Sequence, residues 1–257
     1  MRLENSFVLI PGFGEKTEKK LWQNDITHWD HVQETDFLTQ NKRDKALNFL
    51  EKARRNLEVN NSMFFNSKLG SKRTWRMYRN FEQNACFFDI ETTGLDAKKN
   101  KVTTVSFYRN GEDITLIQGK DLTKENLEKE LFKSDILVSF NGKRFDQPFL
   151  EQNYDMNIKT PHIDLMYPLK RLGYTGGLKK IEKDLEVDRE LEDIDGREAV
   201  RLWKEYERNG NQNALDKLVR YNQYDSRNLK QLLDIVHSRM KNKVFEPYRT
   251  SRAESGK

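Results

Sequence analysis

Four acidic side chains and one tyrosine are the residues of this sequence with the types and spacing that could do chemistry. Asp89 and Glu91 lie near the end of an apolar run, FFDIE, that indicates a buried strand. Residues two apart in a strand point to the same face, so both carboxylates face one side. Asp146 follows another apolar run, in NGKRFDQPFL. Tyr221 and Asp225, in YNQYD, are four apart and share one face of a predicted helix.

Converging carboxylates need a cation between them. They repel one another, and their pKa values rise unless a cation intervenes. Oxygen ligands without a His or Cys cluster are typical of Mg²⁺ or Mn²⁺, and not of Zn²⁺. Two such ions about 3.5–4 Å apart can activate a water and stabilise the leaving oxygen in phosphodiester cleavage. The residue types therefore predict two divalent metal ions. The alternative is that the acids are capping or surface residues, because short acidic pairs also occur by chance.

Hydrophobic periodicity predicts the elements that position these residues. Strands are expected at 86–90, 102–108, 114–118, 136–140 and 161–165. Helices are expected at 16–22, 39–58, 124–132, from about 147, and at 178–185, 198–208 and 215–240. Three strands joined by short turns, followed by alternating helix and strand, favour an α/β fold. We expect a mixed central sheet flanked by helices, with a small helical amino-terminal module.

Length and composition restrict the class of protein. The chain has 257 residues, enough for one or two domains with a genuine core. Residues 1–15 lack the apolar stretch of a signal peptide, and no run approaches the roughly 20 apolar residues of a membrane span. Cys86 is the single cysteine, lies in an apolar run and is predicted to be a buried thiol. These features lead us to expect a soluble cytoplasmic protein.

Positive charge is concentrated in one segment. Residues 41–80 hold eleven Lys or Arg and three acids, a net charge of +8, in a chain whose formal charge is +5. Such a block is typical of a polyanion-binding surface, although an ordinary solvated helix face has the same composition. Trp75 and Tyr78 lie among these cations and are available to stack on bases or to anchor the segment.

The amino-terminal segment LIPGFGEKTEKKL contains a glycine turn directly before a helix. Gly12 and Gly14 allow positive φ and close backbone approach, and a helix N-terminus after such a turn can bind an anion. The segment resembles a helix–hairpin–helix element, whose hairpin amides contact a DNA phosphate. The alternative is a compact structural cap. The candidate nucleic-acid contacts are Gly12, Gly14, Lys16, Lys72, Arg73 and Arg76.

Three sequence motifs together carry a family resemblance. FDIETTGL, NGKRFDQPFL and YNQYD resemble the three exonuclease motifs of the DEDD, ribonuclease H-like superfamily. Tyr221, four residues before Asp225, matches the DEDDy branch. The second motif is similar to that of family B DNA polymerase proofreading domains. The whole chain resembles the stand-alone YprB-type ribonuclease H-like proteins from about residue 62 to 237, including WRMYRNF, HIDL, GGLKKIE and DIDGREAVRLWKEYERNG.

The resemblance implies a role for each residue of the motifs. The expected metal ligands are Asp89, Glu91, Asp146 and Asp225. These four positions and Tyr221 all match the family pattern. Tyr221 would orient the attacking water by a hydrogen bond. Its phenol suits positioning better than full deprotonation at neutral pH.

Further residues are expected to hold the substrate or the surrounding backbone. Thr92 and Leu95 would line the pocket beside the terminal nucleotide. Asn141 would hold the 3′ end by a hydrogen bond and Phe145 by stacking, although Phe145 could equally be core packing. Asp164, in HIDL, is expected to be structural and not a ligand, because the two-metal scheme requires no acid there.

These features together predict a metal-dependent 3′→5′ exonuclease that releases nucleoside 5′-monophosphates from single-stranded DNA or DNA ends. An RNase or a structure-selective endonuclease on the same site is one alternative, and a nucleic-acid-binding adaptor is another. DNA is favoured over RNA as the partner, although no residue reports on the 2′-hydroxyl. The expected segments are a helix–hairpin–helix-like module at 1–36, a basic helical connector at 37–84, the ribonuclease H-like domain at 85–240 and a loose basic tail at 241–257.

Overall fold

The apolar runs predicted as strands form one five-stranded sheet in the computed structural model, which describes residues 1–188 and 194–249. The strands are β1 (Ala85–Thr92), β2 (Val102–Arg109), β3 (Glu112–Ile117), β4 (Ile136–Ser139) and β5 (His162–Asp164). Their order in the sheet is β3-β2-β1-β4-β5. The β1–β2 and β2–β3 pairs are antiparallel, and the β1–β4 and β4–β5 pairs are parallel. The predicted mixed sheet is confirmed, with β1 at its centre.

The chain forms two compact units. The sheet unit comprises Gln83–Asp234, and the helical unit comprises Met1–Glu82 with the residues from Ile235 onward. Helices of the sheet unit are α5 (Lys124–Phe132), α6 (Asp146–Tyr154), α7 (Met166–Leu172), α8 (Leu178–Asp184), α9 (Gly196–Asn209) and most of α10 (Gln212–Val244). Helices of the helical unit are α1 (Glu15–Gln23), α2 (Gln40–Glu58), α3 (Ser62–Leu69), α4 (Tyr78–Phe81) and short 3-10 turns at Leu3–Asn5, Trp29–Val32, Thr74–Met77 and Glu246–Tyr248. A further 3-10 turn, Glu82–Asn84, lies where the chain enters the sheet unit.

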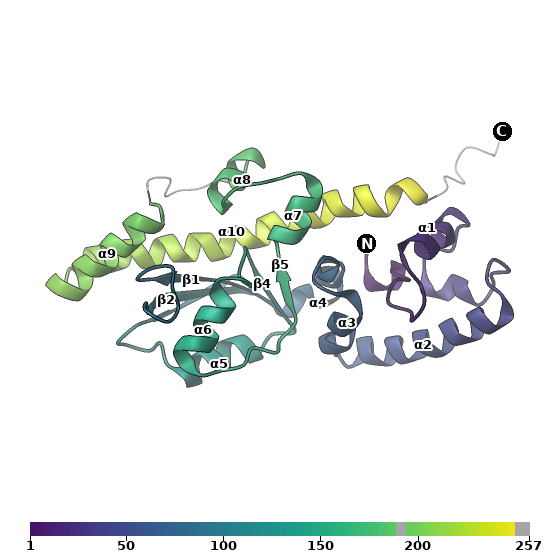
Figure 1. The fold of residues 1–257 in the computed structure, drawn as a ribbon, viewed down its shortest axis with the longest axis horizontal. Coiled ribbons are helices and arrows are strands. Elements are labelled where there is room, and N and C mark those ends of the chain that lie inside the picture. The colour runs from purple at the N-terminus through teal and green to yellow at the C-terminus, as the bar shows by residue number, and fades with distance from the viewer. Residues whose placement is uncertain (189–193, 250–257) are drawn as a thin grey trace. The chain divides into compact units, whose positions relative to one another are not determined.

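The side chains of β1 alternate between the two faces of the sheet, as a strand requires. Cys86, Phe88 and Ile90 pack in one apolar core with residues of α5 and α6. Asp89 lies on the other face, where Asn222 of α10 donates a hydrogen bond to it. Helices therefore cover both faces of the sheet, α5 and α6 on one and α10 on the other (Figure 1). Cys86 is fully buried as predicted, and burial raises the pKa of its thiol to about 12.

Several element boundaries differ from the predictions. Helices α3 and α7 were not predicted, because each is short and carries little helical periodicity. The tail predicted to be loose from residue 241 begins instead as ordered backbone, since α10 continues to Val244. Val244 and Phe245 are buried, and Phe245 lies edge-on to Trp22 with ring centroids 5.0 Å apart. Burial of these two side chains is the physical reason for the extension. The predicted tail beyond residue 249 lies outside the described residues.

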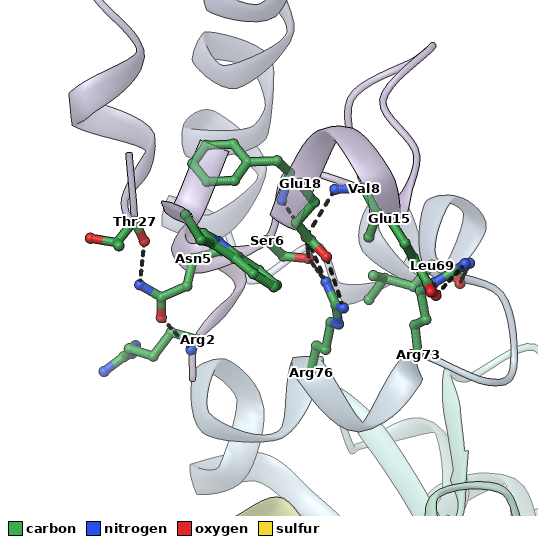
Figure 2. Close-up of polar contacts among 12 residues, drawn as sticks. Arg2, Asn5, Ser6, Val8, Glu15, Glu18, Thr27, Leu69, Arg73 and Arg76 are labelled. Carbon is green, nitrogen blue, oxygen red and sulfur yellow. Dashed lines mark hydrogen bonds and ion pairs between the residues drawn. The ribbon is translucent and has the colours of Figure 1, made fainter. Parts of the chain in front are cut away.

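A buried ion pair organises the helical unit (Figure 2). Glu18 Oε1 accepts hydrogen bonds from the amides of Phe7 (2.8 Å) and Val8 (3.1 Å) and from Arg76 Nη1 (2.8 Å). Glu18 Oε2 accepts from Arg76 Nη2 at 3.0 Å. The prediction that Arg76 contacts nucleic acid is wrong, because its side chain is 0% exposed and its guanidinium is paired with the Glu18 carboxylate. Trp75 and Tyr78 are also buried, so they anchor the segment and are not free to stack on bases.

The remaining amino-terminal candidates lie at or near the surface of the helical unit. Gly12 has a φ of 84°, a left-handed conformation that favours glycine, and Gly14 is the N-cap of α1. Lys16 and Lys72 are exposed. Arg73 is paired with Glu15, the first residue of α1, with Nη2 to Oε1 at 2.8 Å. A role for these residues in nucleic-acid binding stays a prediction.

No helix in the described part of the chain is long and apolar enough to cross a membrane.

Candidate metal centre

Three carboxylates meet on the α10 face of the central strand. Asp89 and Glu91 come from β1, and Asp225 comes from α10, with one oxygen of each lying within 4.8 Å of the others. The β1–β2 register shifts between Glu91 and Thr92, so a bulge ends the regular pairing directly after the second carboxylate. Asp225 is only 5% exposed. The sequence prediction that these three acids converge agrees with the geometry.

Burial and mutual repulsion act on the acids in the same direction. Burial raises the pKa of Asp89 well above its usual range, and the charges of Asp225, Asp146 and Glu91 raise it further. Burial also raises the pKa of Asp146 to about 7, against the opposing effect of amide hydrogen bonds. A divalent cation beside these oxygens would offset both effects. The donor set consists of carboxylate oxygens, which fits Mg²⁺ or Mn²⁺.

Asp146 reaches the site from the first turn of α6, outside the group of three oxygens. Strand β4 ends at Ser139 and does not extend alongside Ile90 of β1. The Ile90 amide donates a hydrogen bond to the Asp146 carboxylate and not to a residue of β4. Gly142 makes this approach possible. A Cβ there would lie 2.1 Å from Ser139 Oγ and 3.3 Å from Asp146 Oδ2. The loop between β4 and α6 therefore requires a residue without a side chain at this position.

Asn222 was missed by the sequence analysis, although it lies between Tyr221 and Asp225. Its Nδ2 donates to Asp89 Oδ2 at 2.7 Å, and its Oδ1 accepts from Thr104 Oγ1 at 2.9 Å. Asn222 and Thr104 are both 0% exposed. The chain of two hydrogen bonds fixes one oxygen of Asp89 and lowers the pKa of that carboxyl, against the larger effect of burial. No sequence signal distinguishes this asparagine from one that caps or faces solvent.

Tyr221 lies one helical turn before Asp225 on α10 and is 6% exposed. Its ring packs against apolar residues of α9 and α10. The ammonium nitrogen of Lys179, on α8, lies 5.6 Å from the centre of the ring. The structure thus places Tyr221 on the helix that carries Asp225, and its role in positioning water stays a prediction.

A pocket of about 560 Å³ lies next to Glu91. Thr92, Leu95 and Phe145, which were predicted to contact substrate, line it, and Leu95 is 86% exposed. Phe145 also contacts Phe149, with ring centroids 4.9 Å apart, so it belongs to both the pocket and the core. A second group of lining residues was not predicted. Its residues are Asp195, Gly196, Arg197 and Val200, from the start of α9.

Asn141 is not among the described residues that line this pocket. It has a φ of 61°, and its backbone amide donates to Asp164 Oδ1 at 2.8 Å. Asp164 also accepts from the amides of Lys143 (3.3 Å) and Met166 (3.0 Å). These three bonds agree with the prediction that Asp164 is structural, since its carboxylate ties the loop before α6 to the start of α7. The predicted contact of Asn141 with the 3′ end stays a prediction.

Comparison with known proteins identifies the class. Residues 86–237 match RNase_H_2, of the RNase_H superfamily, and the chain belongs to this family. The family places it among ribonuclease H-like nucleases, whose substrates are nucleic acids and whose chemistry uses divalent metal ions. The matched segment contains every carboxylate of the candidate centre.

Solved structures show a similar fold at low identity. Brucella melitensis NrnC bound to pGG is 19% identical over 67% of this chain and 81% of that chain, with a TM-score of 0.49. Brucella melitensis NrnC with bound Mg²⁺ has the same identity and coverage and a TM-score of 0.48. The family B DNA polymerase of Pyrobaculum calidifontis is 16% identical over 64% of this chain and 26% of that chain, with a TM-score of 0.47. The comparison with curated proteins gave no match.

Proposed function

We propose that this protein is a metal-dependent 3′→5′ exonuclease of the DEDDy, YprB-like type that acts on single-stranded DNA or DNA ends and releases nucleoside 5′-monophosphates. The observation that carries the proposal is the approach of Asp89, Glu91 and Asp225 to within 4.8 Å. Three carboxylates this close are unfavourable without a cation, and they belong to a nuclease family.

The carboxylates would hold two divalent ions, with Asp146 as the fourth ligand. Bound ions supply charge stabilisation and a more acidic water at the scissile phosphate. Asn222 holds Asp89 in one orientation through its 2.7 Å hydrogen bond, so that ligand is positioned before any ion binds. Tyr221 would hold the attacking water by a hydrogen bond through its hydroxyl.

The pocket beside Glu91 would receive the terminal nucleotide. Its volume of about 560 Å³ and its exposed Leu95 suit a base and sugar, and Phe145, which lines it, would stack on the base. Because Glu91 lines the pocket, the phosphate of that nucleotide would lie next to the metal ligands. A pocket that takes one terminal nucleotide would lead to removal of one nucleotide at a time from an end, and Asn141 would bind the 3′ end.

DNA contact by the helical unit is part of the proposal. The glycine turn at Gly12 and Gly14 precedes α1, and exposed Lys16 and Lys72 lie in the same unit. Arg73 would contribute charge while remaining paired with Glu15. These groups would bind phosphates without reading base sequence.

The test is digestion of 3′-labelled and 5′-labelled DNA and RNA oligonucleotides, with Mg²⁺ or with EDTA. We expect the 3′ label to be released as a mononucleotide, the 5′ label to remain on a shortening ladder, and EDTA to stop both. Asp89→Asn and Asp225→Asn should abolish cleavage. Asp216→Asn is the matched control, because Asp216 is an exposed acid on the same helix as Asp225.

Each outcome bears on a separate part of the proposal. Full cleavage by both Asp89→Asn and Asp225→Asn would falsify the assigned centre. Internal cuts would contradict the exonuclease assignment, and release of the 5′ label first would contradict the direction. Faster digestion of RNA than of DNA would overturn the substrate preference and leave the metal centre intact.

A further inference from the structure

A small groove in the helical unit lies apart from the candidate metal centre. It has a volume of about 310 Å³ and lies between the segment before α1 and one face of α2. The α2 residues recur at helical spacing, three, four and seven positions after the first, so they form a continuous wall. The lining residues are Ile10, Pro11, Lys45, Asn48, Phe49 and Lys52.

The groove carries positive charge that no residue in the described part of the chain neutralises by an ion pair. Three arginines of α2 form ion pairs with carboxylates. The pairs are Arg43 with Asp36, Arg54 with Asp30 and Arg55 with Glu51. Lys45 and Lys52 have no ion pair with any residue in the described ranges 1–188 and 194–249, and both are exposed. None of the six lining residues is acidic. The groove is therefore complementary to an anion.

The spacing of the charges indicates an extended anion. Seven residues of α-helix place Lys45 and Lys52 about 10 Å apart along the axis. Between them lie the Asn48 amide and the half-buried ring of Phe49, which is stacked on Phe64 at 5.7 Å. Two cations separated by an amide and an aromatic surface suit two phosphates of one strand, with sugars or a base between them.

We propose that this groove binds the sugar–phosphate backbone of a single-stranded nucleic acid, with Lys45 and Lys52 each contacting one phosphate. The choice of nucleic acid over an acidic peptide rests on the proposed nuclease function. The site differs from the glycine turn of Gly12 and Gly14, because its cations come from α2. It adds affinity without base recognition, since the contacts go to phosphates.

The test measures binding, not cleavage. The anisotropy of a labelled single-stranded DNA or RNA oligonucleotide is followed with the full chain in EDTA as NaCl is raised. Each phosphate contact on a single strand contributes about 0.7 to the slope of log affinity against log salt. Lys45→Gln with Lys52→Gln should therefore weaken binding and make the slope shallower by about 1.4. DNA and RNA should respond alike, because both share the phosphate backbone.

The control removes the same charge elsewhere in the unit. Lys42 and Lys68 are exposed and do not line the groove, so Lys42→Gln with Lys68→Gln should change the slope by less than half as much. Equal slopes in the two double variants would overturn the proposal, as would displacement of the oligonucleotide by poly-glutamate at equal charge concentration. Because these readouts need no catalysis, failure of the groove and failure of the Asp89 and Asp225 assignment are seen separately.

Discussion

Glu18 of the helical unit and Asp89 of the sheet unit are both carboxylates set among buried residues, and their surroundings differ. Glu18 accepts hydrogen bonds from two backbone amides and from both terminal nitrogens of Arg76, so the positive charge of Arg76 balances its negative charge. Asp89 accepts one amide hydrogen bond from Asn222 and lies beside other carboxylates. A buried carboxylate paired with an arginine stabilises the fold, whereas several carboxylates close together indicate a site where a cation binds.

The largest expected effect comes from breaking the matched pair. Arg76→Met leaves Glu18 buried without its cation, and loss of one partner of such a pair costs about 3–5 kcal/mol. Arg73→Met is the matched control, because the Arg73–Glu15 pair is partly exposed and contributes at most about 1 kcal/mol. Urea unfolding monitored by circular dichroism measures both. Equal destabilisation by the two variants would contradict the special role of the buried pair.

The next effect concerns the accumulation of like charge. Mg²⁺ or Mn²⁺ should stabilise the wild-type protein, by about 2.7 kcal/mol at a concentration one hundred times its dissociation constant. Asp89→Asn should lose this stabilisation, whereas Arg76→Met should keep it in its folded fraction. Thermal unfolding with and without the metal checks the prediction. A wild-type protein whose melting temperature does not respond to either metal contradicts the metal centre.

A smaller effect tests the positioning of Asp89. Thr104→Val keeps the shape of the side chain but leaves the Asn222 Oδ1 without its donor, which costs about 1–3 kcal/mol. We expect weaker Mn²⁺ binding in calorimetry and a lower kcat with little change in KM. Thr104→Ser, which keeps the hydroxyl, should retain both properties. If Val and Ser at this position bind Mn²⁺ equally, the hydrogen-bond chain does not position the ligand.

The smallest effect comes from a third kind of buried group, one that stays neutral. Burial lowers the pKa of His162 from 6.5 to about 3, and Ser139 Oγ lies 2.7 Å from its Nε2. Below pH 6.5 the unfolded chain takes up a proton that the folded protein does not, so stability falls as pH falls. Between pH 6.5 and about 5.5 this histidine should contribute a loss of about 1 kcal/mol.

Urea unfolding at the two pH values checks this contribution. His162→Gln should lose the corresponding part of the pH dependence, and His31→Gln should keep it, because His31 is exposed. A pH dependence that is unchanged in His162→Gln would mean that the histidine takes up its proton equally in the folded and unfolded states.

The comparison also explains how much the sequence could predict. Strands and long helices were predicted because apolar spacing is a local property, and the three converging acids were found because strand and helix spacing fixes their direction. The Glu18–Arg76 pair joins residues 58 positions apart, and neither residue has a local pattern that indicates the other. Arg76 was therefore assigned to the surface from its basic neighbours.

The residues that support the candidate metal centre could not be predicted for a related reason. Asn222 and Thr104 are 118 positions apart and become partners only when α10 lies on the sheet. The α9 wall of the pocket likewise depends on how the start of one helix meets the loop after β1. Chemistry-bearing residues can be recognised by type and spacing, but the groups that hold them depend on tertiary packing.

The crowding at Gly142 restricts the position of Asp146 but not the shape of the neighbouring pocket. No side chain fits between Ser139 and Asp146, so the distance from the end of β4 to this carboxylate is set by backbone alone. Leu95, on the pocket wall, is 86% exposed and meets no such restriction. Substitutions can therefore reshape the pocket while the loop keeps Asp146 where it is. In this fold, the residues that line the pocket are free to drift while the loop that carries Asp146 stays fixed.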